Sequence, residues 1–163
     1  MPIKVKEEKA YLTETSRQLF KKIDFIDTFS TTNHTNTMME ISNLVFNTSP
    51  KWVGFLFKIR NGIVKLFGLK TSMPKDYNTK FEVGGYIKFF KIYEITENEV
   101  VLGANDSHLN FRAIINNTHS PIHNIKVTTL VQFNNSMGRI YMSIIKPFHR
   151  LVVIKMVKQA YNN

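Results

Sequence analysis

Two adjoining runs, residues 107–116 and 123–134, alternate apolar and polar side chains, and this pattern constrains the fold most strongly. A two-residue period is typical of strands that are packed on one face. The apolar side chains that share this face are Leu109, Phe111, Ala113, Ile115, Ile125, Val127, Val131 and Phe133. The short, turn-like joint at residues 117–121 indicates that the two runs pair side by side. We therefore expect an antiparallel sheet with one packed face.

Other segments add to this sheet. Strand-like runs occupy residues 23–32, 84–95 and 99–104. In the first of these, Phe25 and Phe29 flank Asp27 on one side of the pleat, because successive side chains of a strand point to opposite faces. Asp27 is therefore expected among inward-looking aromatic side chains.

Helices are expected on both sides of these strands in the chain. Asn36 or Thr37 is a suitable cap for a first helix that continues to about residue 46. A second helix is expected over residues 51–67, ended by Gly68. A long helix begins after residues 134–136 and runs to about residue 160.

The long C-terminal helix contains Pro147, which must bend it or split it into two. Its basic residues Arg139, Lys146 and Arg150 share a stripe. Its apolar residues run down the other side and are expected to pack against the sheet. This apolar side consists of Ile140, Ile144, Phe148 and Leu151, with Tyr141, Ile145 and Val152 beside them.

The order of elements (strand, two helices, antiparallel strands, long last helix) predicts an α+β fold of the helix-grip type. In this fold a curved antiparallel sheet wraps around the C-terminal helix and leaves a cavity between them. Residues 23–161 are expected to form this single domain after a lead-in at residues 1–22. The 163 residues suffice for one core without disulfides, and the chain has no cysteine. The acidic start and the lack of a long apolar stretch favour a cytoplasmic, non-spanning protein.

The net charge of +10 comes from two stretches without Asp or Glu, residues 41–75 with six Lys/Arg and 107–163 with seven. Such stretches are typical of solvated faces or of surfaces for phosphate-bearing partners.

Lys51, Lys58 and Lys65 recur every seven residues and share one face of the second helix. The opposite side of this helix is an arc of aromatic and aliphatic side chains. The combination indicates either a helix that binds an anionic membrane surface or an ordinary helix packed on its apolar side. Nucleic acid is the least favoured partner, because the aromatic residues follow core periodicity. The oligomeric state has no signal in the sequence.

Polar residues at unusual positions are the candidates for function. Arg60 lies in the centre of the apolar arc of the second helix, where a guanidinium must be paired, reach solvent or face a polar cavity. Asp27 or Asp106 is its candidate partner, in a structural ion pair or a ligand site.

His108 and Arg112 project from one strand face, which is either the solvent-exposed side of the sheet or the lining of the cavity. In the second case Arg112 holds a ligand carboxylate or phosphate, and His108 exchanges a proton.

On the last helix, Tyr141 and His149 are the polar groups able to reach a ligand. The candidate ligand-binding set is Asp27, Arg60, His108, Arg112, Tyr141 and His149. His119 and His123 have neither a cysteine nor an obvious third ligand near them, so no metal is expected. No cofactor is expected either, since the chain lacks a Walker loop, a dinucleotide fingerprint and a nucleophile elbow.

Several segments resemble an uncharacterised bacterial family. They are residues 101–112 (VLGANDSHLNFR), residues 141–150 (YMSIIKPFHR), Lys51-Trp52-Val53, and the stretch from Arg60-Asn61-Gly62 to Gly68-Leu69-Lys70. That family is similar to the START, or pollen-allergen-like (SRPBCC), superfamily of helix-grip proteins, and the resemblance covers residues 22–161. It implies a hydrophobic cavity, since many members bind lipids, steroids or polyketides and a minority are cyclases or hydrolases. We expect binding of a small hydrophobic or amphiphilic molecule, with acid-base catalysis or peripheral membrane association as alternatives.

Overall fold

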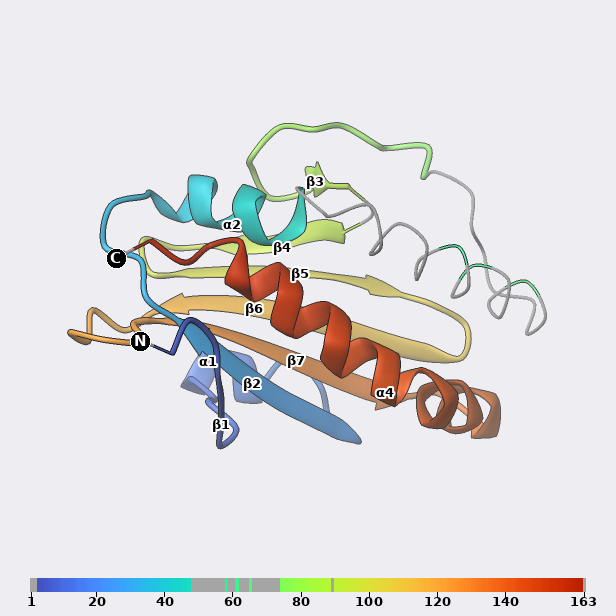
Figure 1. Cartoon of the computed structure of the whole chain (residues 1–163). Helices are drawn as coiled ribbons and strands as arrows, with labels where there is room; N and C mark the ends of the chain where they lie inside the picture. Colours follow the sequence, from blue (N-terminus) through green and yellow to red (C-terminus); the bar gives the residue numbers. More distant parts are fainter. Residues whose placement is uncertain are drawn as a thin grey trace.

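The computed structural model describes residues 3–47, 58, 61, 65, 74–88 and 90–162. It has the expected α+β architecture, with a curved antiparallel sheet of seven strands and a long C-terminal helix across one face (Figure 1). The strands are β1 (Lys6–Glu8), β2 (Phe25–Thr31), β3 (Tyr86–Ile87), β4 (Phe90–Ile95), β5 (Glu99–Asn105), β6 (Leu109–Asn117) and β7 (Ile125–Phe133). The helices bounded within the described residues are α1 (Glu14–Arg17), α2 (Met38–Phe46) and α4 (Ser136–Lys158).

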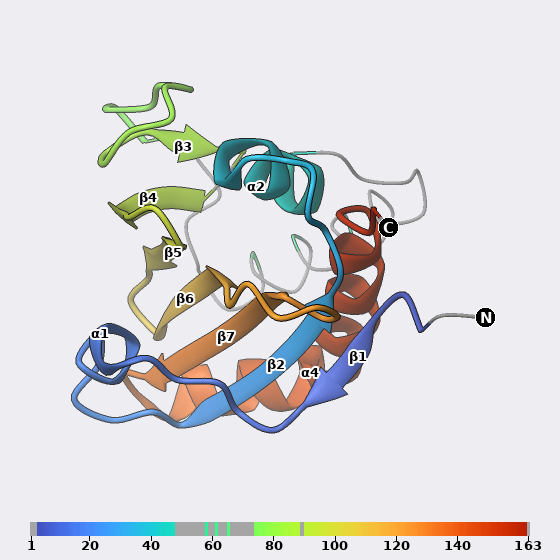
Figure 2. The same cartoon turned by 90° about the vertical axis from the view of Figure 1, so that its left-hand side faces the viewer.

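In the sheet, β2, from the first part of the chain, pairs with the last strand, β7. Its order is β1-β2-β7-β6-β5-β4-β3, and all neighbouring strands are antiparallel. Asp27 on β2 lies opposite Thr129 on β7, and Thr129 lies opposite Ala113 on β6. Figure 2 shows the sheet curving around α2 and α4, with α1 on the other side. We call these two sides the inner face and the outer face.

The inner face carries the apolar side chains that the alternation predicted, so their shared orientation is confirmed. Ala113, Ile115, Ile125 and Val127 belong to the largest core cluster, which also contains residues of α2 and α4. Nearer the start of α4, Leu109 and Val131 pack with helix residues in a second cluster. The two-residue period of β6 and β7 thus directs this row of side chains toward the helices.

The outer face is packed as well, which corrects the expectation of a single packed face. Val101, Ile114 and Leu130 are completely buried there, in a cluster with Phe20. Apolar side chains occupy outward positions at the centre of the sheet, and they need a cover. Residues 12–23 provide that cover, so the segment preceding β2 is part of the packed structure.

Capping interactions place the ends of the helices where the sequence predicted them. Thr37 accepts a hydrogen bond from the backbone N–H of Glu40, and the Glu40 carboxylate accepts one from the N–H of Thr37. This reciprocal capping box begins α2. Asn135 caps α4 by accepting a hydrogen bond from the N–H of Gly138.

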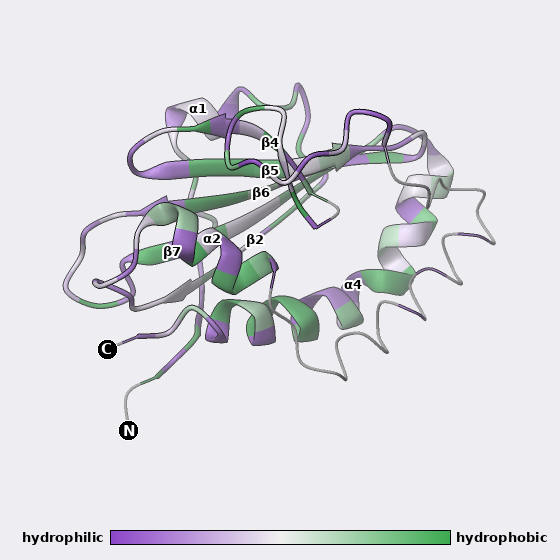
Figure 3. Ribbon diagram, turned by 90° about the horizontal axis from the view of Figure 1, so that it is seen from above, coloured by the Kyte–Doolittle hydropathy of each residue, from purple (hydrophilic) through white to green (hydrophobic). Residues whose placement is uncertain are grey.

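α4 is a single helix that contains Pro147 and changes direction along its length (Figure 3). A proline has no N–H for the carbonyl four residues earlier, and its ring crowds that carbonyl, which favours a bend. The start of the helix lies very close to the β5–β6 hairpin. A Cβ on Gly138 would lie 2.1 Å from the carbonyl oxygen of His108, so glycine permits this approach.

The side of α4 that packs on the sheet differs from the expected one. Its buried residues are Gly138, Tyr141, Met142, Met156 and Val157. The predicted stripe is exposed instead, with relative exposures of 47% for Ile140, 42% for Ile144, 39% for Phe148 and 48% for Leu151. α4 carries two apolar stripes with the same helical period. The expectation was wrong for these four residues, whereas Tyr141, Ile145 and Val152 beside them do pack in the core clusters. No helix in the described ranges is long and apolar enough to span a bilayer.

Candidate functional site

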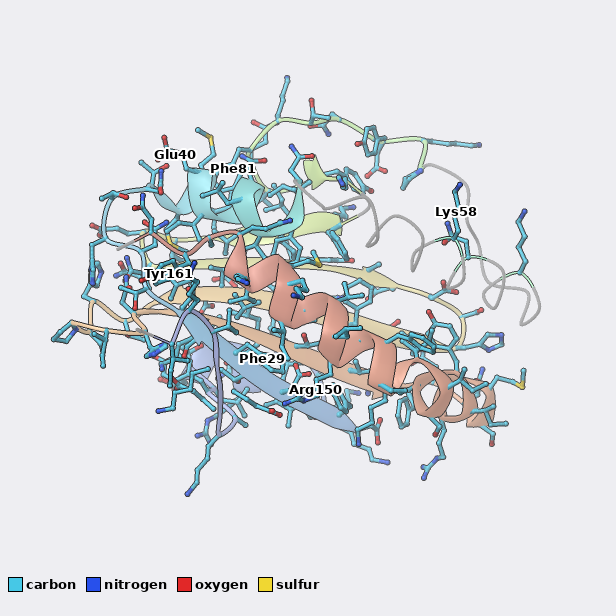
Figure 4. The ribbon with its side chains drawn as sticks, viewed as in Figure 1. Phe29, Glu40, Lys58, Phe81, Arg150 and Tyr161 are labelled. Atoms are coloured by element: carbon cyan, nitrogen blue, oxygen red, sulfur yellow. The ribbon has the colours of Figure 1, made fainter. Side chains whose placement is uncertain are left out.

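Two of the predicted site residues, Asp27 and His149, meet between β2 and α4. Nε2 of His149 lies 3.0 Å from Oδ2 of Asp27, and the two side chains are 17% and 13% exposed, respectively. They are separated by 122 residues in the chain. Figure 4 shows Phe29 and Arg150, sequence neighbours of this pair, in the region where α4 crosses β2.

Local structure explains how each member of the pair reaches this position. Asp27 points inward because the pleat of β2 directs every second side chain to the inner face, as the sequence predicted. His149 lies on the part of α4 that crosses β2, and the edge of its ring packs against the ring of Phe25 at a centroid distance of 5.6 Å and an angle of 85°. This edge-on contact fixes the plane of the imidazole beside the carboxylate.

The Asp27 carboxylate is only half satisfied. Oδ2 contacts His149, whereas Oδ1 is buried and has no hydrogen-bond partner within the described part of the chain. A buried polar atom without a partner costs roughly 1–3 kcal/mol, so such atoms call for a specific explanation. Nδ1 of His149 likewise makes no hydrogen bond with any described residue. The pair therefore offers one acceptor oxygen and one ring nitrogen for further contacts.

The surroundings of the pair are apolar on one side and basic at the rim. Phe25 belongs to the cluster that contains Tyr141, so the predicted site residue Tyr141 lies on the same face, buried among apolar side chains. At the rim, the ammonium of Lys146 lies 5.5 Å from the centre of the Phe25 ring. Arg150 forms an exposed ion pair with Glu7 of β1. The pair therefore lies between apolar side chains on one side and basic groups at its rim.

Arg112 lies on the opposite side of the sheet. Its guanidinium is stacked between the rings of Tyr93 and Phe20, with centroid distances of 3.8 and 5.1 Å, and Nη1 donates to Asn105 Oδ1 and to the Phe111 carbonyl. Burial lowers the pKa of Arg112, and Tyr93 partly opposes this. The side chain is buried under the segment that precedes β2, so it forms neither the expected wet side of the sheet nor the lining of a space beneath α4.

The remaining predicted site residues do not join Asp27 and His149. His108 is half-buried at the β5–β6 hairpin and bonds with Asn135, the cap of α4. Arg60 lies outside the described residues, as does Lys51. Within the ranges that the structure describes, no three His, Asp or Glu side chains are grouped so that they could hold a metal ion.

A hollow that the sequence did not predict lies away from this pair, between α2 and the chain around β3. Its volume is about 240 Å³, and it is lined by Met39, Asn43, Asn47, Tyr77, Thr79, Phe81, Tyr86, Ile87 and Lys88. Burial, and the hydrogen bond that the Tyr86 hydroxyl donates to Asp76, raise the pKa of Tyr86 to about 12. Because residues 70–80 have the composition of a polar loop, the sequence contains no signal for this hollow.

The curved antiparallel sheet with a polar pair held beneath its long C-terminal helix defines a helix-grip-like α+β protein. The chain belongs to the family described as "Protein of unknown function (DUF2867)", whose model matches residues 19–156. The predicted membership in an uncharacterised family is thereby confirmed. No curated protein and no solved structure is significantly similar to the chain.

Proposed function

We propose that this protein binds a small amphiphilic molecule between the inner face of the sheet and α4, with the polar end of the ligand at Asp27 and His149. The observation that carries the proposal is the buried Oδ1 atom of Asp27, which has no partner within the described residues. A ligand group that bonds to this atom would remove the cost of leaving it unsatisfied. Phe25 and Tyr141 contribute apolar surface for the body of the ligand.

The chemistry of the pair defines the head group. A carboxylate oxygen accepts hydrogen bonds, so the ligand presents a donor such as a hydroxyl or an ammonium group. An acidic head group is disfavoured beside Asp27, because like charges repel strongly where water is excluded. Of the two arginines expected to hold an acidic head, Arg112 is packed into the outer face and Arg60 lies outside the described residues. The proposed ligand is therefore a neutral or cationic amphiphile.

The proposal includes a place for this family in the START, or SRPBCC, superfamily, whose members often bind lipid-like molecules. The support is the helix-grip-like arrangement of a curved antiparallel sheet and a long C-terminal helix. Fold likeness alone does not determine function, so the proposal depends mainly on the polar pair.

The test compares three probes of equal chain length, dodecanol, dodecylamine and dodecanoate, by isothermal titration calorimetry. We expect the alcohol and the amine to bind about tenfold more tightly than the acid, the effect of one buried hydrogen bond or charge contact. Native mass spectrometry of protein purified from a cell extract should show a retained small molecule with a donor group. The absence of binding by all three probes, together with protein free of any retained molecule, would overturn the proposal.

Two substitutions of the same kind provide the matched control. Asp27→Asn removes the charge from the proposed site and should abolish the preference for the amine over the acid. Asp24→Asn makes the same chemical change three residues earlier, where the carboxylate already accepts the N–H of Phe133 and contacts Lys22. It should leave probe binding unchanged. Equal losses in the two variants would point to general destabilisation and contradict the assignment of Asp27.

Acid-base catalysis at the same pair is a second candidate function, favoured by the 3.0 Å contact between Asp27 and His149. In this alternative Asp27 orients the imidazole and stabilises its protonated form, while Nδ1 of His149 takes a proton from the substrate. The reaction class would be proton transfer in a cyclase-like or hydrolase-like step. A retained molecule that is converted by the wild-type protein but only bound by His149→Asn would support catalysis. Unchanged conversion in that variant would exclude His149 as the base.

A further inference from the structure

The exposed apolar stripe of α4 is the least explained surface of the fold. Ile140, Ile144, Phe148 and Leu151 follow one another at steps of four, four and three residues, so they form a continuous line along one side of the helix. Met137, 36% exposed, extends this line toward the start of α4. Single exposed apolar residues are common, but a contiguous line of them marks an interaction surface. We call these five residues the α4 stripe.

The α4 stripe is not required for the contact between α4 and the sheet. That contact uses a different side of the helix, on which Tyr141, Met142 and Met156 are buried. The hydrophobic effect disfavours surplus apolar surface in water, at about 25 cal/mol for each Å². A helix that needs only one apolar side for its fold therefore gains from a partner for the second.

The charges of α4 indicate what kind of partner this is. The helix contains five Lys/Arg and no Asp or Glu. Arg139, Lys146 and Lys158 are exposed. The cationic groups of Arg139 and Lys146 lie at the edge of the sheet, over the rings of Phe133 and Phe25. Among the described residues, Arg150 pairs with Glu7, in an ion pair whose side chains are 58% and 48% exposed. Such exposed pairs exchange readily with other charges. The partner surface should therefore be both apolar and anionic.

A second copy of the chain and nucleic acid fit these features poorly. Stable interfaces bury about 800 Å² on each partner, and a stripe along about four turns of one helix supplies only a fraction of that area. Two acid-free basic helices also repel each other. Nucleic acid offers phosphates to the basic residues but has no apolar surface for a line of aliphatic side chains.

We propose that α4 docks on an anionic lipid bilayer, with the α4 stripe in the interfacial region and the basic side chains at the lipid head groups. Interfacial helices combine these two features, and each Lys or Arg near an anionic bilayer adds to the attraction. Lys58 and Lys65, which the sequence predicted on one basic helix face, are exposed as well. This inference goes beyond ligand binding and does not depend on it, because the α4 stripe is on a different side of α4 from the residues that face the sheet and the Asp27 and His149 pair.

Vesicle co-sedimentation tests the proposal. We expect the protein to bind vesicles of phosphatidylcholine with about a quarter phosphatidylglycerol, and to lose most of that binding in roughly 0.5 M salt. Ile144→Ser/Phe148→Ser should weaken binding at least about tenfold, because two apolar side chains no longer enter the interface. Arg139→Gln/Lys146→Gln should weaken binding to anionic vesicles about fivefold for each charge and reduce the salt dependence.

The matched control removes exposed apolar residues elsewhere. Val83→Ser/Ile122→Ser changes side chains that are 64% and 70% exposed but lie outside α4, so it should bind vesicles as the wild type does. Failure of the wild type to bind anionic vesicles would overturn the proposal, as would undiminished binding by Ile144→Ser/Phe148→Ser. A wild-type dimer that this variant converts to a monomer would overturn it in favour of self-association. A large loss of thermal stability in the variant would also overturn it, because the α4 stripe would then be covered within the chain.

Discussion

The two faces of the sheet hold buried charged groups in different ways. On the outer face, Arg112 is stacked between two rings and bonded to neighbouring carbonyls, and the Glu99 carboxylate accepts hydrogen bonds from Thr13 and Asn116. On the inner face, Asp27 has one oxygen at His149 and the other without a partner in the described chain. The comparison separates a role in stability from a role in binding, because Asp27 keeps a buried acceptor atom without a partner among the described residues, whereas Arg112 is enclosed by the groups that hold it.

Outer-face residues should show the largest effect on stability. Arg112→Ala removes the stacked guanidinium and leaves a gap between Phe20 and Tyr93. We expect the free energy of unfolding to fall by about 3 kcal/mol, through the cavity and the unpaired acceptors left behind. Urea denaturation followed by circular dichroism measures this loss. Arg150→Ala, at an exposed ion pair, is the control and should cost less than about 1 kcal/mol. Equal losses of unfolding free energy from the two substitutions would contradict the expected difference between the buried and the exposed arginine.

Replacing the inner-face pair should abolish binding without lowering stability, whereas replacing Arg112 on the outer face should lower stability. Asp27→Leu/His149→Phe replaces a partly satisfied polar pair with apolar side chains. We expect a stability equal to the wild type or higher by about 1 kcal/mol, because replacing a buried polar pair by apolar residues is often neutral or favourable. Binding of the dodecanol and dodecylamine probes should be lost in the same protein. A variant that unfolds readily would show that the pair has a structural role, like Arg112.

A smaller effect, visible on acidification, should come from Asp24, which immediately precedes β2. Burial acts to raise the pKa of Asp24, but the hydrogen bond from the N–H of Phe133 and the contact with Lys22 outweigh it, so the pKa is lowered. A lowered folded-state pKa gives stability that is present above the unfolded carboxyl value and is lost as the pH falls through the folded value. Asp24→Asn should therefore be less stable than the wild type near neutral pH. It should also lose less stability on acidification.

Thermal denaturation between roughly pH 6 and pH 3 measures this difference. Glu8 has a lowered pKa as well, since hydrogen bonds from Lys126 and Ser30 outweigh its burial, and it keeps part of the acid dependence in the variant. An Asp24→Asn protein with the wild-type response to acid would contradict the role given to this carboxylate.

The strands and their side-chain directions were predictable from the sequence. The period of two in β6 and β7 places Leu109 and Arg112 on opposite faces, and the structure agrees. The same period places Asp27 with Phe25 and Phe29. These predictions succeed because the direction of a side chain in a strand depends only on the local backbone. The helix caps at Thr37 and Asn135 are local in the same sense.

The cover of each face was not predictable in the same way. Nothing in the alternation of β6 shows that Phe20 lies over Arg112, because that contact depends on the path of a segment about 90 residues away. The choice between the two apolar stripes of α4 is also not local. Both have helical periodicity, and only the bend of the helix and its path across β2 decide which one contacts the sheet.

The sequence by itself determined the strands β6 and β7, the starts of α2 and α4 and the face to which these strand residues point, since these follow from local backbone geometry and capping. It did not show β1 and α1 within residues 1–22 or the division of residues 84–95 into β3 and β4. The tertiary structure alone decided that Asp27 meets His149, that Arg112 is buried on the far side, and that the α4 stripe remains exposed. Each of these outcomes depends on where segments far apart in the chain cross, and that is set by packing of the whole core.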